Sequence, residues 1–428
     1  MSRGSEKENG AAGCGAAPVS CGLRVGVVAD DLTGASDTGV QFARRGYRTI
    51  VVFAGERVPA GRWEVVVLDT DSRSLPPGEA ALRVGEASKT VSRAGVVYKK
   101  IDSTLRGNVV AEVRGMLAAT GRKRAVISPA FPAAGRTTSG GVQMADGRPV
   151  SKTEFGADPD DPVQESSLER MFSGPGGVRV VGTGSLERSG KSPVEAACGC
   201  EYIIADAIGE RHLLLLVEGF DRLGDHLWVG SAGLAGALSE RLAREEPSRQ
   251  MDLPESDLPG ASTGGGPALI AVGSLNEASQ RQLEFLRGRS GVEAVPLTGP
   301  LQTARRARVS LEAGRDTVVY SPRSRGTRSA ADISGCFASV VRGLDGAGGF
   351  GGLVLTGGDT AVAVGRALGG RGLRLGGEVE PGVPFGWLVG PRPYRVVTKA
   401  GGFGGRDALA KAAAFLGAGG NPPGIYGG

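Results

Sequence analysis

The sequence predicts an α/β protein built from two doubly wound, mostly parallel-sheet domains. Short apolar runs alternate with helical patterns along most of the 428 residues, and this order demands parallel strands with helices on both faces. A chain of this length favours two or three domains. Residues 246–266 are rich in Pro, Ser, Gly and charge without any period, which is typical of a linker between two such blocks.

The first predicted domain spans residues 23–245. Apolar runs of four to eight residues bounded by Gly or polar residues indicate buried strands, and longer periodic stretches indicate helices. The expected order is strand 23–29, helix 35–45, strands 49–53 and 65–68, helix 78–93, strand 96–100, helix 109–120, strands 125–128, 202–205 and 213–217, and a helix near 232–244. Segment 131–165 interrupts this rhythm, and a loop of that length is usually functional or disordered.

The second predicted domain spans residues 267–417. Its expected elements are strand 268–272, a helix from 277, strands 293–296 and 317–320, helix 330–343, strand 352–355, a helix from 360, and a last strand and helix around 395–416. Residues 1–22 and 418–428 lack any apolar pattern and are expected to be disordered tails.

Composition excludes several classes of protein. With 40% hydrophobic and 22% charged residues, the chain can form ordinary cores. A net charge of +5 with only 5% aromatic residues and no basic block argues against nucleic acid and fits a small anionic substrate. Five cysteines without a CxxC pair, and two histidines, disfavour a Cys/His metal site. No signal peptide or membrane-length apolar run is present, so we expect a cytoplasmic protein without a membrane partner.

Four strand ends of the first domain carry polar residues, and the first is the most telling. An apolar run from Val25 ends in two adjacent carboxylates, Asp30 and Asp31, which are costly side by side unless a cation meets them. The other strand ends are followed by residues 69–73 (DTDSR), 99–106 (KKIDSTLR) and 128–136 (SPAFPAAGR). Carboxyl ends of parallel strands share one edge, so these groups should converge. Each could also be an ordinary capped turn.

Glycine-rich turns follow strands of the second domain. Thr356-Gly357-Gly358-Asp359-Thr360 opens one helix, and residues 398–405 (TKAGGFGG) precede another. Glycines before a helix let backbone N–H groups approach a phosphate, and the helix dipole favours its charge. With Gly273-Ser274 after the domain's first strand, these turns favour a nucleotide pocket in which Lys399 suits the phosphates. The sequence lacks a GxxxxGK[ST] P-loop and an opening GxGxxG.

These motifs together resemble the four-carbon acid sugar kinase family. The resemblance covers residues 23–417 and rests on an ordered set: ADDLTGASD (29–37), KKIDSTLRGN (99–108), SPAFPAAGRTTSGG (128–141), TEFGADPDDPV (153–163), VGSAGLA (229–235), LTGGDTA (355–361), EVEPGVP (378–384) and TKAGGFG (398–404). The resemblance implies an N-terminal domain for the acid sugar, a C-terminal domain for ATP and an active site in the cleft between them.

The implied reaction transfers the γ-phosphoryl group of ATP to the terminal 4-hydroxyl of threonate, erythronate or 3-oxo-tetronate, in sugar-acid catabolism. The matching positions imply sugar-acid contacts from Asp30, Asp31, Arg73, Lys99, Asp102, Ser103 and Arg106, and ATP contacts from Ser274, Gly357, Gly358, Asp359, Thr360, Gly401, Gly402, Phe403 and Gly404. Phosphoryl transfer also needs Mg²⁺, whose ligands the sequence does not identify, and a base near the hydroxyl. An aspartate after the first strand suits that base, and Asp31 is favoured over Asp30.

Two other functions stay open at this point. One is a non-catalytic two-domain regulatory protein that binds a sugar acid and a nucleotide, and the other is a kinase for a different small polyhydroxy acid. The choice among the three sugar acids and the existence of a homo-oligomer are also open.

Overall fold

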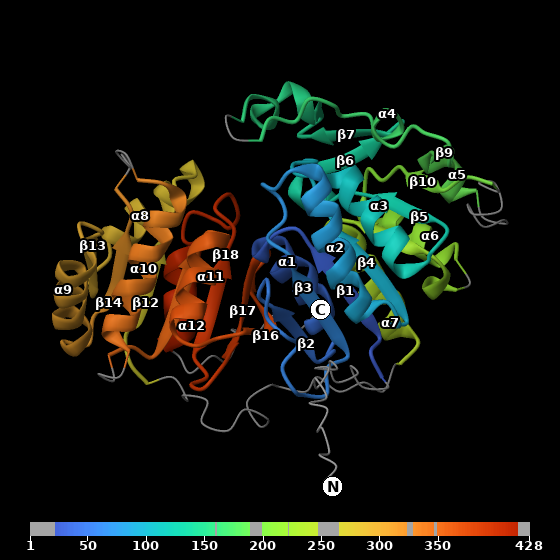
Figure 1. Cartoon of the computed structure of the whole chain (residues 1–428). Coiled ribbons are helices and arrows are strands. Elements are labelled where there is room, and N and C mark those ends of the chain that lie inside the picture. Colours follow the sequence, from blue (N-terminus) through green and yellow to red (C-terminus); the bar gives the residue numbers. More distant parts are fainter. Residues whose placement is uncertain are drawn as a thin grey trace, which may run out of the picture.

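The computed structural model describes residues 22–158, 161–188, 199–220, 222–246, 265–322, 328–345 and 349–417. Over these residues the chain forms one broad sheet with helices on both faces (Figure 1). The predicted tails, apart from residue 22, and nearly all of the predicted linker 246–266 lie outside the described residues. No helix in the described part of the chain is long and apolar enough to cross a membrane.

The N-terminal half alternates strands and helices from its first strand onward. Its elements are β1 (Val25–Ala29), α1 (Leu32–Ala43), β2 (Thr49–Val52), β3 (Val65–Asp69), α2 (Pro77–Val91), β4 (Val96–Lys100), α3 (Val109–Thr120), β5 (Ala125–Ser128), α4 (Leu168–Met171), β9 (Val178–Val181), α5 (Thr183–Glu187), β10 (Tyr202–Ala205), α6 (Glu210–Glu218), β11 (Leu227–Gly230) and α7 (Ala232–Arg244). Its central strands are buried on both faces, as continuous apolar runs require.

The C-terminal half repeats this alternation. Its elements are β12 (Ala268–Val272), α8 (Glu277–Arg287), β13 (Val292–Pro296), α9 (Pro300–Glu312), β14 (Asp316–Tyr320), α10 (Ala330–Leu344), β15 (Gly352–Thr356), α11 (Gly358–Ala367), β16 (Gly372–Glu380), β17 (Val383–Val389), β18 (Arg395–Lys399) and α12 (Ala408–Gly417). The predicted α/β class with mostly parallel strands is therefore confirmed.

The two parallel sets belong to one 15-stranded sheet in the order β13-β14-β12-β15-β18-β17-β16-β2-β3-β1-β4-β11-β5-β10-β9. The antiparallel strands β16 and β17 join them, since β17 pairs with β18 and β16 pairs with β2. No pattern in the sequence predicts this join. The two parallel sets run in opposite directions, because three successive antiparallel pairings lie between β2 and β18.

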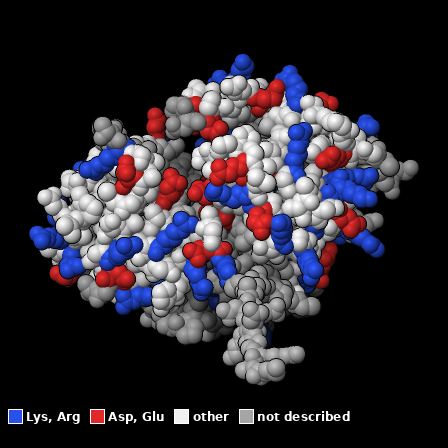
Figure 2. Space-filling view, in the orientation of Figure 1, with Lys and Arg blue, Asp and Glu red and all other residues white. Residues whose placement is uncertain are grey.

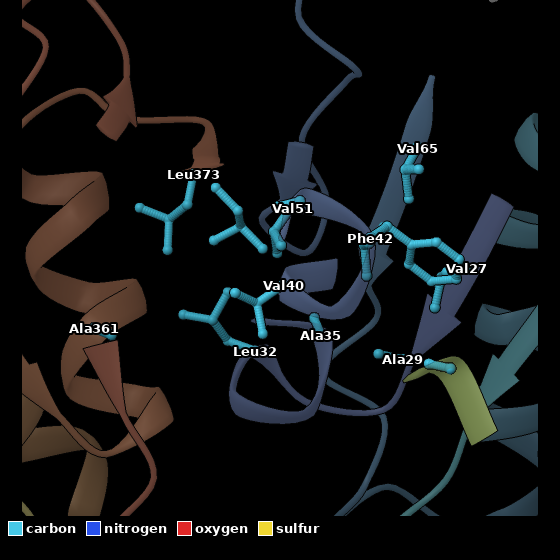
Figure 3. Close-up of a cluster of buried hydrophobic side chains, with 14 of the residues drawn as sticks. Val27, Ala29, Leu32, Ala35, Val40, Phe42, Val51, Val65, Ala361 and Leu373 are labelled. Atoms are coloured by element: carbon cyan, nitrogen blue, oxygen red, sulfur yellow. The ribbon is translucent and has the colours of Figure 1, made fainter. Parts of the chain in front are cut away.

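One hydrophobic core runs across the join. On one face of the sheet, a single cluster includes Leu234 of α7, Phe42 of α1, Leu373 of β16 and Phe337 of α10. Figure 3 shows side chains of α1 in this cluster, lying beside those of β2 and β16. The opposite face carries two separate clusters, one under α2 and α3 and one under α8 and α12. The halves are therefore packed as one body along the face that carries α1.

Segment 131–165 is structured for most of its length. A small antiparallel sheet is formed by β6 (Arg136–Ser139), β7 (Val142–Ala145) and β8 (Arg148–Pro149). It lies over the carboxyl edge of the N-terminal half, above α2 and α3 in Figure 1. The segment that interrupts the predicted rhythm is thus a cover for that edge.

One predicted element is wrong. Residues 213–217, expected to be a strand, lie within helix α6. Leu213, Leu216 and Val217 are buried while Leu214 and Leu215 are only partly buried, which is the spacing of one helix face. Five consecutive apolar residues fit either structure, and the polar residues on both sides of the run extend it to helix length.

Candidate functional site

The four polar strand ends of the N-terminal half do converge. Strands β3, β1, β4, β11 and β5 are parallel neighbours, so the residues after β1, β3, β4 and β5 share one edge. The local sequence determines the position of Asp31, which follows β1. Asp31 caps α1 by accepting a hydrogen bond from the Gly34 N–H at 2.9 Å, so the helix begins at Leu32, earlier than predicted.

Arg73 is the cation that meets the two adjacent aspartates. Its Nε donates to Asp30 Oδ2 at 2.7 Å, and its Nη2 lies 2.8 Å from Asp31 Oδ1. Burial alone would raise the pKa of Asp30, but Arg73, Lys99 and Lys100 more than offset this and lower it to about 2. Asp30 is therefore ionised, and both carboxylates are engaged by one guanidinium.

A second ion pair lies beside the first. Arg106 Nε donates to Asp102 Oδ2 at 2.5 Å, and Thr104 Oγ1 donates to the same oxygen at 2.7 Å. Burial opposes ionisation of Asp102, yet Arg106, Arg73 and Lys100 hold its pKa well below the usual range. Leu105, between these residues, has φ of 65°, and Asp71 in the neighbouring loop has φ of 48°. Such non-glycine conformations are costly and gather at sites where the chain must aim specific groups.

Lys99 and Lys100 take different places because consecutive strand residues point to opposite faces. Lys99 is fully buried, with its Nζ 2.8 Å from Glu112 Oε2 of α3, and Glu112 Oε1 accepts from Ser72 Oγ at 2.6 Å. Lys99 therefore supports the 69–73 loop from below instead of facing a ligand as expected. Lys100 points toward α1. Its Nζ lies so close to Gly34 that a Cβ atom added to this glycine would be only 2.3 Å away.

The small sheet closes over Ser103 and Arg106. Gln143 Nε2 donates to the Ser103 carbonyl at 2.7 Å. The guanidinium groups of Arg106 and Arg136 each lie 5.6 Å from the ring centre of Phe155. These contacts come from elements far apart in sequence, so sequence reasoning missed Gln143 and Phe155 and placed Arg136 only within a strand end.

In the C-terminal half, three predicted turns also meet. They follow β12, β15 and β18, which are parallel neighbours. A Cβ on Gly401 would lie 2.3 Å from Ser274 Oγ, and one on Gly357 would lie 3.9 Å from Ser274 Cβ. Gly357 has φ of 89° and ψ of 134°, a backbone conformation that only glycine adopts without strain.

The glycine turn leads directly into α11. The N–H groups of the first turn of a helix lack partners within it and favour anions. Thr360, in that turn, is buried, whereas Asp359 is exposed. The Thr360 Oγ1 packs against Gly273, since a Cβ atom added to this glycine would lie 2.1 Å from it. The first turn of α11 thus combines backbone N–H groups with the exposed side chain of Asp359.

Lys399 organises the second glycine loop. Its Nζ donates to the carbonyls of Ala400, Gly401 and Phe403 at 2.7, 3.1 and 3.0 Å. Gln282 Nε2 donates to the carbonyls of Phe403 and Gly404 at 3.0 Å each. Burial lowers the pKa of Lys399 to about 8. The hydrogen bonds from Lys399 and Gln282 to these carbonyls fix the shape of the loop. The sequence did not indicate this structural role of Lys399.

The remaining residues of this loop differ in their surroundings. A Cβ on Gly402 would meet only Asn276, at 3.7 Å or more, so this position is open. Gly404 has φ of 84°, and the Phe403 ring packs against Gly382 at the turn between β16 and β17.

The two edges meet at the N-termini of α1 and α11. A Cβ on Gly358 would lie 3.0 Å from Thr33 Oγ1. A small cavity at this place, which we call the seam cavity, is lined by Leu32, Thr33, Ser36, Asp37, Gly357, Gly358, Ala361, Pro384, Thr398, Lys399 and Ala400. On the face shown in Figure 2, acidic and basic side chains are interspersed, without a broad basic patch of the kind that nucleic acid requires.

Comparisons with known proteins agree with this division of the site. A family model described as "Sugar-binding N-terminal domain" matches residues 25–238, and one described as "Nucleotide-binding C-terminal domain" matches residues 269–409. The D-threonate kinase of Salmonella typhimurium is 34% identical over 432 residues, which cover 92% of this chain and 98% of that protein. This chain belongs to the four-carbon acid sugar kinase family.

Other relatives in the family are named for different substrates. The D-erythronate kinase of Heliobacterium modesticaldum is 28% identical, covering 91% of this chain and 96% of its own length. The 3-oxo-tetronate kinase of Cupriavidus necator is 27% identical, covering 92% and 97%. A solved structure from Haemophilus influenzae shares the fold at a TM-score of 0.72 and 22% identity, covering 91% of this chain and 100% of that one.

The family assignment and the geometry divide the site in the same way. The sugar-binding model spans the Asp30–Arg73 and Asp102–Arg106 ion pairs, and the nucleotide-binding model spans all three glycine turns. Within the described residues, no group of three or more His, Cys, Asp or Glu side chains is placed to hold a metal ion.

Proposed function

We propose that this chain is an ATP-dependent kinase that phosphorylates the terminal hydroxyl of a four-carbon sugar acid, with D-threonate as its first candidate substrate. Relatives named D-threonate kinase, from Salmonella typhimurium, Bordetella bronchiseptica and Cupriavidus necator, are 33–35% identical to it. Relatives named for erythronate and 3-oxo-tetronate are 26–29% identical. The observation that carries the proposal is the meeting of the charged edge and the glycine turn of α11 at Thr33 and Gly358.

The sugar acid would bind along the charged edge of the N-terminal half, residues 23–245. Arg73 is already committed to Asp30 and Asp31, and Lys99 to Glu112. The candidates to meet the substrate carboxylate are Lys100, Arg106 and Arg136, although Arg106 is also paired with Asp102 and Arg136 Nη1 lies 3.7 Å from Asp146 Oδ2. The Arg106 side chain is 31% exposed and that of Arg136 is 22% exposed, so both reach the surface of the edge. Their planar guanidinium groups suit bidentate binding of a carboxylate.

The carboxylates of this edge would orient the sugar hydroxyls. Asp30 and Asp31, fixed by Arg73, offer acceptor oxygens, and Ser103 lies beside the Asp102–Arg106 pair. A site with several fixed hydrogen-bonding groups discriminates strongly against a ligand that lacks the matching hydroxyl or carboxylate. Neutral tetritols should therefore be poor substrates.

ATP would bind to the C-terminal half, residues 267–417. The backbone N–H groups of Gly358, Asp359 and Thr360 at the start of α11 would hold a terminal phosphate, helped by the helix dipole. Ser274 and the loop of Gly401, Gly402, Phe403 and Gly404 line the same edge. Lys399 contributes by holding that loop in shape and by its charge.

Magnesium fits this arrangement as a companion of the nucleotide. Mg²⁺ usually keeps several waters and binds through phosphates and one or two carboxylates, not in an all-protein cage. The described residues contain no such cage, and Asp359 places a carboxylate in the first turn of α11. Asp359 would hold the ion, which would neutralise charge on the phosphates.

A coupled assay with Mg²⁺ and ATP tests the proposal. We expect phosphorylation of D-threonate, with lower kcat/KM for D-erythronate and 3-oxo-tetronate, and negligible activity with the matching tetritols. Equal rates with erythronate and erythritol would contradict the proposed carboxylate recognition. Tight binding of sugar acid and ATP without turnover would instead identify a non-catalytic binding protein.

A further inference from the structure

A buried carboxyl group at the seam cavity belongs to neither of the two ion pairs of the charged edge. Asp37 lies in the second turn of α1 with 9% of its surface exposed, and its Oδ1 has no hydrogen-bond partner. The neighbouring Ser36 Oγ, 1% exposed, also lacks a partner. Both residues line the seam cavity. Buried polar atoms are normally satisfied, so these orphan oxygens call for an explanation.

Asp37 stands between the two substrate regions. The seam cavity brings it together with Gly357 and Gly358, where the terminal phosphate would bind, and with Lys399. On its other side, Lys100, Asp31 and Asp102 of the sugar-acid edge act on its charge. Asp37 therefore lines the same cavity as the glycine turn at which a phosphate held by α11 would lie.

The carboxylates of the edge that pair with an arginine are poor proton acceptors. Asp31 Oδ1 accepts from the Gly34 N–H and lies against Arg73. Asp30 is paired with Arg73 and has a pKa of about 2, and the pKa of Asp102 is also held low by its ion pair with Arg106. A base with so low a pKa gives little driving force for removing a proton from an alcohol. Burial raises the pKa of Asp69, to about 7, but its Oδ1 accepts from the Asp71 N–H and it does not line the seam cavity.

The surroundings of Asp37 raise its pKa, whereas those of Asp30 and Asp102 lower theirs. Burial is the main cause that raises its pKa, to about 8, and Glu378 of β16, Asp31 and Asp102 act in the same direction, while Lys100 of β4 opposes them. Glu378 is itself paired with Arg44, the residue that follows α1. Lys399 of β18 also lines the cavity. A general base works best with a pKa near the operating pH.

We propose that Asp37 is the general base of the reaction, an inference that rests on the proposed kinase function. The proton of the sugar acid's terminal hydroxyl moves to Asp37 Oδ1. The hydroxyl oxygen forms a bond to the γ-phosphorus of ATP, and the bond from that phosphorus to the β–γ bridging oxygen breaks, so that ADP leaves. Asp37 then releases the proton to solvent. Asp31, expected from the sequence to be the base, instead orients the substrate and caps α1.

The test compares the full-length wild type with Asp37→Asn and with Ser36→Ala, a control that alters the same cavity but keeps the carboxyl group. We expect Asp37→Asn to lower kcat by about 10²–10⁴, with the calorimetric affinities for ATP and the sugar acid changed less than about threefold. Ser36→Ala should stay within about threefold of wild-type kcat. Wild-type kcat/KM for the sugar acid should rise with pH to a plateau above about 8, and the residual activity of Asp37→Asn should not follow this profile.

Several results would overturn the inference. A folded Asp37→Asn variant with near-wild-type kcat would remove Asp37 from the chemistry. Loss of Mn²⁺–ATP affinity in this variant would make Asp37 a metal ligand instead. A wild-type kcat/KM that is flat from pH 6 to 9 would count against the inference even if the variant did not fold. A wild type that phosphorylates no sugar acid would overturn the proposed function together with this inference.

Discussion

The buried ion pair between Lys99 and Glu112 allows a quantitative prediction of how substitutions change the free energy of unfolding. Both side chains are almost completely shielded from water, and Glu112 carries the hydrogen bond from Ser72 that fixes the loop of Arg73. Glu112→Gln leaves an ammonium buried without its counter-charge, and Lys99→Met leaves a buried carboxylate. Removing one partner of a buried pair costs about 3–5 kcal/mol. The double variant removes both charges, so we expect it to lie within about 1–2 kcal/mol of the wild type.

Equilibrium urea unfolding measures this, with fluorescence of Trp228 as a probe, because Trp228 on β11 is fully buried and pairs with Tyr98 on β4, next to Lys99. The coupling energy from the double-mutant cycle should be at least about 3 kcal/mol. The Glu112→Gln variant should also raise KM for the sugar acid without changing KM for ATP. Additive single effects, or single losses below about 1 kcal/mol, would refute the reasoning that this pair supports the site.

Three further predictions address the two edges and the seam. Gly357→Ala should weaken ATP binding at least tenfold in calorimetry, because φ of 89° with ψ of 134° strains any residue with a Cβ; unchanged affinity would show that the turn does not hold phosphate. Asp31→Asn should still accept from the Gly34 N–H, so its main effect should be a raised KM for the sugar acid with a smaller loss of kcat than Asp37→Asn shows; a kcat loss near 10³ at unchanged KM would restore Asp31 as the base. The pKa of Asp37 rises from 3.8 to about 8 on folding, so its contribution to stability is present below about pH 4 and is lost as pH rises to 8. Asp37→Asn should therefore become more stable relative to the wild type between pH 5 and 8 in thermal unfolding, and a constant difference would contradict the raised pKa.

Local patterns in the sequence were sufficient for much of the fold. Strands β4, β5, β10 and β12 and helices α3 and α7 occupy the residues predicted for them, because fully buried parallel strands appear as apolar runs with sharp ends. The convergence of Asp30 with Arg73 follows from the rule that parallel strands share a carboxyl edge. No local pattern, however, marks β16 and β17 as the join, since their pairing with β2 and β18 is decided by packing over a long sequence distance.

The assignment of single side chains was less accessible from sequence. The adjacent lysines of β4 are indistinguishable as letters, and only the alternation of strand faces separates Lys99, beneath the loop, from Lys100, beside α1. Glu112 and Asp37 are both polar residues within helical patterns, where solvent exposure is the ordinary expectation. Their burial depends on which helix face meets the sheet, and that is a property of the assembled fold.

The antiparallel pairing of β2 with β16 has a consequence for how this protein can be divided. Cutting the chain at the 246–266 segment would separate two halves whose parallel strand sets are each complete, yet each half would expose a full row of backbone donors and acceptors along β2 or β16. Such open strand edges recruit other chains. The hydrophobic cluster that crosses the join would also be left open to water on both halves. Fragments made at this boundary should therefore aggregate or re-associate, and chimaeras between family members should exchange β16 and β17 together with the N-terminal half that they complete.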